Sequence, residues 1–110
     1  MRLLKFVLIS LVFASTTFGA AIHEAAKKGD LAEVTRLFKA GVNVNEKDQY
    51  GQTALMGAAS RGQVEVVRFI LKVSADVNVR DKSGRTALGW AVKKGQHQTA
   101  DILRKAGGKE

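Results

Sequence analysis

The chain has 110 residues, which is enough for one domain, and its 45% hydrophobic and 25% charged residues are ordinary for a globular protein. It contains no cysteine, which excludes disulfides, thiolate metal ligands and cysteine nucleophiles, and no proline that would interrupt a helix. Its 18 basic and 10 acidic residues give a net charge of +8, which favours acidic partners.

The N-terminal segment, 1–21, differs in character from the rest of the chain. Arg2 and Lys5 make a positive start, residues 6–14 are apolar except for Ser10, and small and polar residues follow up to Ala21. This order is that of a secretory signal peptide, and the apolar core is about half the roughly 20 residues of a transmembrane helix. We therefore predict a signal peptide at 1–21 and a periplasmic or secreted protein from a bacterial host.

The signal peptide leaves two points open. Cleavage after Gly19 or after Ala21 satisfies the preference for small residues, and the alternatives to cleavage are a buried N-terminal helix or an uncleaved membrane anchor. Loss of Arg2 and Lys5 would leave 16 basic and 10 acidic residues, a net charge of +6.

Residues 22–110 repeat themselves at an offset of 33. The matching sets are Asp48 and Asp81; Gly51 and Gly84; Asn45 and Asn78; Ala25, Ala58 and Ala91; Gly29, Gly62 and Gly95; and Leu37, Ile70 and Leu103. A period of this length predicts a solenoid, in which each unit buries its apolar face by stacking on the next. The predicted units cover about 22–47, 48–80 and 81–110.

The middle unit shows the elements most clearly. Residues 48–51 predict a turn, in which Asp48 bonds nearby backbone N–H groups. Thr53 is a suitable N-cap for a short helix to about residue 60, and Gly62 predicts its left-handed end. A second helix with a broad apolar stripe is predicted at about 64–72, followed by an extended return at 75–79. Small residues such as Ala58 on the short helix would let neighbouring units approach closely.

These segments resemble the ankyrin repeat family. The family signature D-x-x-G-x-T-P-L-H-x-A-A-x-x-G corresponds to DQYGQTALMGAASRG at 48–62 and DKSGRTALGWAVKKG at 81–95, and residues 22–45 keep all of the unit but its turn. Alanine stands where the family prefers proline, and Met56 and Gly89 stand where it prefers histidine. The resemblance implies an all-α ankyrin-repeat solenoid of about three helix-turn-helix units joined by hairpin-like turns.

The resemblance also implies a binding face, made by the turn tips and the exposed side of the short helices. Ten positions form the candidate partner-binding site: Lys47, Gln49, Tyr50, Gln52, Arg61, Arg80, Lys82, Arg85, Lys93 and Lys94. Four others on this face are Lys27, Lys28, Ser60 and Ser83. Nine of the fourteen are basic and none is acidic, which predicts a basic groove for an acidic protein surface. The alternative is a charged surface that only keeps a small stack soluble.

The two aromatic residues near this face have different expected roles. Tyr50 is the candidate aromatic anchor for a partner, although an incidental exposed side chain at a turn would look the same in the sequence. Trp90 is expected to pack in the core between short helices, and a partly exposed contact site is the alternative.

No pattern in the sequence indicates catalysis. His23 and His97 lie in different units, and no metal-ligand spacing or phosphate-binding glycine loop is present. We therefore predict a protein-binding module without cofactor or enzymatic activity, acting as a small exported adaptor or regulator. The alternative is an electrostatic binder of nucleic acid or anionic polymer, which would favour aromatics interleaved with basic residues. The oligomeric state stays open.

Overall fold

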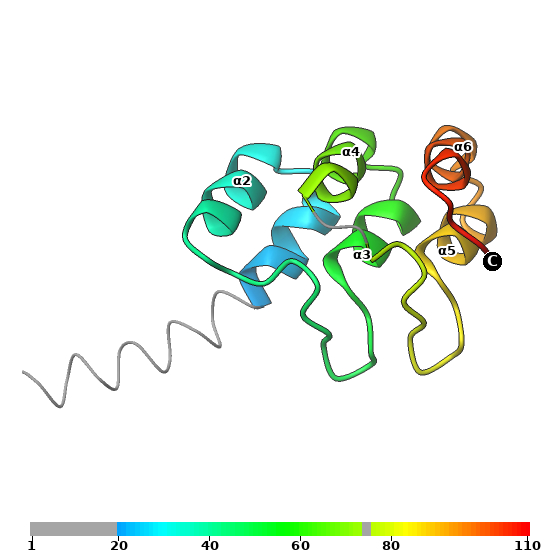
Figure 1. Ribbon diagram of the computed structural model, residues 1–110, viewed down its shortest axis with the longest axis horizontal. Coiled ribbons are helices and arrows are strands. Elements are labelled where there is room, and N and C mark those ends of the chain that lie inside the picture. The colour runs from blue at the N-terminus through cyan, green and yellow to red at the C-terminus, as the bar shows by residue number, and fades with distance from the viewer. Residues whose placement is uncertain (1–19, 74–75) are drawn as a thin grey trace, which may run out of the picture.

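Short helices follow one another in pairs along residues 20–73 and 76–110, which are the residues that this computed structural model describes (Figure 1). A first helix covers residues 20–28 and pairs with α2 (Leu31–Lys39). The next pair is α3 (Ala54–Ser60) with α4 (Val64–Val73), and the last is α5 (Ala87–Lys93) with α6 (His97–Lys105). The described residues contain no strand, so the predicted all-α solenoid is confirmed. The predicted signal peptide lies outside the described residues, except for its last two.

The helices form two layers. The first helix, α3 and α5 lie side by side in one layer, α2, α4 and α6 form the other, and the long turns project beyond the first layer (Figure 1). The short helices begin at threonines, as predicted. Thr53 and Thr86 have extended backbones, and their hydroxyl oxygens accept hydrogen bonds from Met56 N at 3.4 Å and Gly89 N at 3.1 Å.

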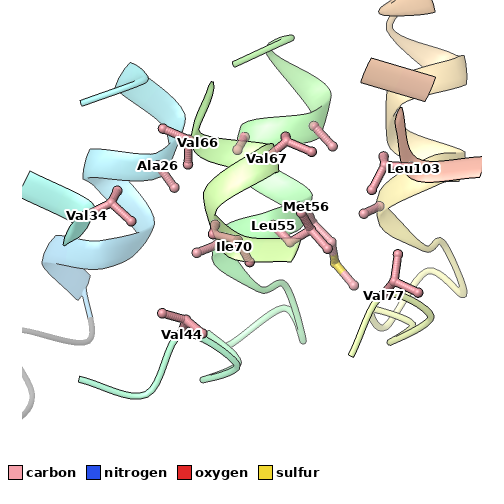
Figure 2. Close-up of a cluster of buried hydrophobic side chains, with 14 of the residues drawn as sticks. Ala26, Val34, Val44, Leu55, Met56, Val66, Val67, Ile70, Val77 and Leu103 are labelled. Carbon is pink, nitrogen blue, oxygen red and sulfur yellow. The ribbon is translucent and has the colours of Figure 1, made fainter. Parts of the chain in front are cut away.

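Alanines make the close stacking of the first layer possible. Ala58 and Ala91 are fully buried, and Ala25 is 5% exposed. Larger side chains fill the space between the layers, where Ile70 and Leu103 lie at equivalent positions of successive units (Figure 2). Burying a side chain of this size contributes about 1.5–3 kcal/mol to stability. The buried residues form one hydrophobic cluster that runs from Ile22 in the first unit to Leu103 in the last.

Side chains also tie each unit to the next by hydrogen bonds that the sequence did not lead us to expect. Gln63 Nε2 donates to the carbonyl oxygen of Lys27 at 2.8 Å, and Gln96 Nε2 donates to that of Ser60 at 3.3 Å. These two bonds are equivalent, because their donors, and likewise their acceptors, occupy the same repeat position in successive units. Each glutamine therefore satisfies a carbonyl at the end of the preceding short helix, which would otherwise lack a partner.

The C-terminal residues lie beside the segment that precedes the last turn. Asn78 Nδ2 donates to Gly107 O at 3.1 Å, and Lys109 N donates to Asn78 Oδ1 at 2.8 Å. The hydroxyl of Thr86 donates to Lys109 O. The C-terminal residues thus cover this side of the last unit.

The glycines between paired helices lead to the first prediction. Gly62 and Gly95 have φ of 70° and 72°, as predicted for left-handed helix ends. A Cβ at residue 62 would overlap the side chain of Gln96, whereas a Cβ at residue 95 would meet nothing within 4 Å. Gly95→Ala should therefore lower the free energy of unfolding by about 1 kcal/mol through backbone strain alone, and Gly62→Ala by more. Urea denaturation of both variants measures the difference, and equal losses would contradict the inter-unit contact.

Candidate protein-binding site

Two aspartates hold the turns that project from the stack. Asp48 Oδ1 accepts hydrogen bonds from the backbone N–H groups of Tyr50 at 2.8 Å and Gln52 at 2.9 Å. Asp81 Oδ1 does the same for the backbone N–H groups of Ser83 at 2.9 Å and Arg85 at 3.0 Å. Because each carboxylate bonds two backbone groups, each turn presents its side chains from a fixed backbone.

Successive turns and units are also joined directly on this side of the stack. Lys82 N donates to Tyr50 O at 3.0 Å, which links one turn to the next. In the first unit His23 Nε2 lies 3.1 Å from Gln52 O. His23 occupies the repeat position that holds Met56 and Gly89 in the later units, so the sequence keeps a histidine contact at one inter-unit boundary.

Trp90 on α5 combines the core packing expected for it with the partial exposure of the alternative. Its side chain packs against the core, as expected, but it is only partly buried. The indole Nε1–H donates to Asp81 Oδ2 at 2.8 Å. The guanidinium carbon of Arg85 and Nζ of Lys93 lie 5.2 and 5.4 Å from the ring centroid, distances at which a cation is attracted to an indole face. Trp90 is therefore held in place by polar and cationic contacts at the surface of the site.

Asp81 stays ionised in this arrangement. Burial raises the pKa of its carboxyl group, but the hydrogen bonds that it accepts, led by the one from the Ser83 hydroxyl, lower the pKa to about 2. The carboxylate that orients Trp90 is thus charged at neutral pH, and it accepts hydrogen bonds from the turn backbone and from the indole N–H.

Two hollows, each of about 400 Å³, lie on this face. We call the first the Gly57 hollow; its lining residues are Lys27, Gln52, Met56, Gly57, Ser60, Arg61, Trp90, Lys94 and Gln96. We call the second the tip hollow; its lining residues are Tyr50, Gln52, Asp81, Lys82, Ser83, Arg85 and Trp90. Gln52 and Trp90 line both hollows, so the two are adjacent and form one surface across all three units.

The Gly57 hollow lies where one repeat position changes along the chain. Glu24, Gly57 and Trp90 are equivalent, since each occupies the same position of its own unit. In the middle unit this position has no side chain, while the indole of the next unit borders the space that results. Comparison of these three residues in the sequence could have indicated the hollow, because large and absent side chains alternate there.

The structure brings most of the predicted site together. Tyr50, Gln52, Arg61, Lys82, Arg85 and Lys94 line the hollows, and Lys93 contacts Trp90. Tyr50 is 61% exposed, as an anchor for a partner would need to be. Lys47 and Gln49 are exposed at the turn without lining either hollow. Arg80 instead donates hydrogen bonds to the carbonyl oxygens of Gly84 at 2.7 Å and Glu110 at 3.2 Å, so its guanidinium contacts its own chain.

The described residues form neither a metal site nor a membrane-spanning helix. Over 20–73 and 76–110, no group of three or more histidine, cysteine, aspartate or glutamate side chains could hold a metal ion. Nor does that part of the chain include a helix of the length and apolarity that crossing a membrane requires.

Paired helices that repeat at a constant period, with ordered turns beside a hollowed face, define a helical repeat protein whose fold serves as an interaction module. Residues 22–110 match the family described as ankyrin repeats (3 copies), and the chain belongs to this family. No relative is found among curated proteins.

Many solved structures are similar to this chain, and one of them covers most of it. It is a complex from Bdellovibrio bacteriovorus, between a predatory endopeptidase and an immunity protein. The match has 37% sequence identity and a TM-score of 0.78, and it covers 81% of this chain and 47% of the matched chain. This chain therefore spans about half the length of the chain that it matches.

The Asp81 carboxylate leads to a prediction on pH dependence. Its folded pKa of about 2 lies below the ordinary 3.8, so its stabilisation is complete above about pH 4 and is lost as the pH falls toward 2. In Asp81→Asn, a carboxamide replaces the acceptor that faces the indole N–H, and no charge titrates. The melting temperature of the variant should be lower at pH 7 and should fall less between about pH 4 and pH 2 than that of the unaltered protein. Melting temperatures that fall equally in both proteins over this pH range would contradict the role assigned to Asp81.

Proposed function

We propose that this chain is an exported binding protein that holds a partner protein by an acidic surface, through the face that carries the two hollows. The observation that carries the proposal is the one-sided charge of that face. The cations that line the hollows or contact Trp90 are Lys27, Arg61, Lys82, Arg85, Lys93 and Lys94. The one acidic residue among the lining residues, Asp81, is bonded to its own turn and to Trp90.

The shape of the face supports a protein partner. The hollows span three units, Tyr50 is exposed beside them, and the indole of Trp90 is held in a fixed position. Tyrosine, tryptophan and arginine are the residues that most often dominate binding energy in protein interfaces. Basic residues around them would speed the encounter with an acidic partner and select against basic ones.

The similar solved structure suggests a class of partner. There, an endopeptidase is in complex with an immunity protein. We propose that this chain likewise restrains an endopeptidase in the compartment to which it is exported. Export itself is proposed from the signal-peptide pattern of residues 1–21.

The electrostatic alternative has one observation in its favour. Tyr50 and Trp90 both border the tip hollow with Lys82 and Arg85, so two aromatics lie among basic residues. The indole, however, already has cations near its ring, and its N–H is bonded to Asp81. Base stacking would displace these contacts, so the arrangement favours a protein surface.

Charge reversal tests the binding face. The fourfold change of Lys82, Arg85, Lys93 and Lys94 to glutamate should reduce crosslinked capture of the partner from the host compartment by about tenfold or more, because like charges would then face each other. The matched control reverses four exposed cations on α2, α4 and α6, namely Lys39, Arg68, Lys72 and Lys105, and should leave capture unchanged. Circular dichroism checks that both variants stay helical. Equal capture by both variants would exclude the proposed face.

The proposed export has its own test. Sequencing of the N-terminus of the protein purified from its host should give a start at Ala20 or Ile22, because cleavage after Gly19 or Ala21 fits the signal pattern. Either start keeps Ile22, which is fully buried in the first unit. A chain that still begins with Met1 would contradict cleavage.

A further inference from the structure

We infer that the Gly57 hollow receives a carboxylate side chain at the tip of a partner loop, and that Gly57 is the residue that determines this specificity. The inference rests on the proposed function, because it assigns one subsite to the proposed protein partner. It differs from that proposal in naming where the acidic group binds and which residue makes room for it.

The geometry at Gly57 supports a built subsite. Gly57 is buried in α3, and its position in the neighbouring units is occupied by Glu24 and Trp90. A Cβ at residue 57 would lie 3.0 Å from Cγ and 3.5 Å from Cε of Lys27. The Lys27 stem therefore lies against the bare glycine backbone, and a large side chain such as leucine at position 57 would displace it.

The backbone gives no other reason for glycine at this position. Gly57 lies in the interior of α3, and it is not one of the glycines with a positive φ. Glycine in a helix is less stable than alanine by roughly 0.5–1 kcal/mol. The stack thus carries a locally unfavourable residue where the Lys27 stem packs against the helix at the edge of the hollow, an arrangement that places the Lys27 charge beside the hollow.

The charges around the hollow select a carboxylate. Its lining includes Lys27, Arg61 and Lys94 and no acidic side chain. Nζ of Lys27 is 3.8 Å from Glu24, but that side chain is 63% exposed, and exposed ion pairs of this kind are weak. Arginine and lysine at a partly enclosed site bind carboxylates through charge-assisted hydrogen bonds. The partly exposed indole of Trp90 suits the methylene stem of a glutamate.

Trp90 gives a direct readout, because it is the only tryptophan of the chain and lines the hollow. The probe is a hexaglutamate peptide, acetylated and amidated so that only side-chain carboxylates are charged. Titration of the full mature protein should give a saturable change in tryptophan emission, and an uncharged hexaglutamine peptide should give none. Hexaglutamate without effect would overturn the inference.

Variants of Gly57 test the role of the hollow. Gly57→Leu should weaken hexaglutamate binding by about tenfold or more, which corresponds to about 1.4 kcal/mol. Gly57→Ala should weaken binding less while the urea midpoint stays equal or rises. The matched control is Gly89→Ala in α5, where a Cβ meets only ordinary contacts at 3.7 Å or more and lines neither hollow. It should keep full binding.

Two further measurements separate this inference from the proposed function. Lys27→Met keeps the stem but removes the charge, so it should weaken peptide binding even if Gly57→Leu unfolds the stack. If Gly57→Leu, folded, binds hexaglutamate normally while the fourfold reversal still abolishes partner capture, the subsite is wrong and the proposed function stands. An oligothymidylate that binds more tightly than hexaglutamate would overturn both.

Discussion

Close approach of the short helices is the constraint on which the rest of this structure depends. α3 and α5 can lie side by side only because alanines such as Ala58 and Ala91 occupy their contact surface, and these side chains are fully buried. Once the helices are this close, one position of each short helix lies beside the hollowed face, exposed in the first unit, buried in the middle unit and partly buried in the last. The residues at that position, Glu24, Gly57 and Trp90, then influence the shape of the face. The same packing that stabilises the stack thus decides where a hollow forms.

Polar groups are arranged in agreement with this packing. Each inter-unit glutamine bonds a helix-end carbonyl of the preceding unit, and each turn aspartate bonds its own backbone. Among the described residues, no buried side-chain nitrogen or oxygen atom lacks a hydrogen-bond partner. Positive charge is consequently left on the lysines and arginines of the surface rather than within the stack. Such a face attracts acidic partners over several ångströms and loses that attraction as salt is added.

Most of the fold could be predicted because its causes are local and repeat at one period. The Thr53 cap and the left-handed Gly62 each depend on a few neighbouring residues, and both were found as expected. The site was harder to predict, because its features depend on pairs of units. The period does not show that Trp90 would reach back to Asp81, nor that Arg80 would contact the C-terminal backbone. Gln63 repeats as Gln96, but only the distance between helices shows that it joins units.

The charge of the face and its surface shape have different consequences for recognition. Surface cations act at long range, so in the proposed binding mode they would attract many acidic proteins to the face without choosing among them. A hollow of about 400 Å³ acts only at contact and rejects a surface without a matching projection. Lys27, Gly57 and Trp90 come from three successive units and line that hollow together, so the proposed subsite would concentrate selection where the units meet. In the proposed binding mode, specificity therefore depends on the middle unit, which has a neighbouring unit on each side.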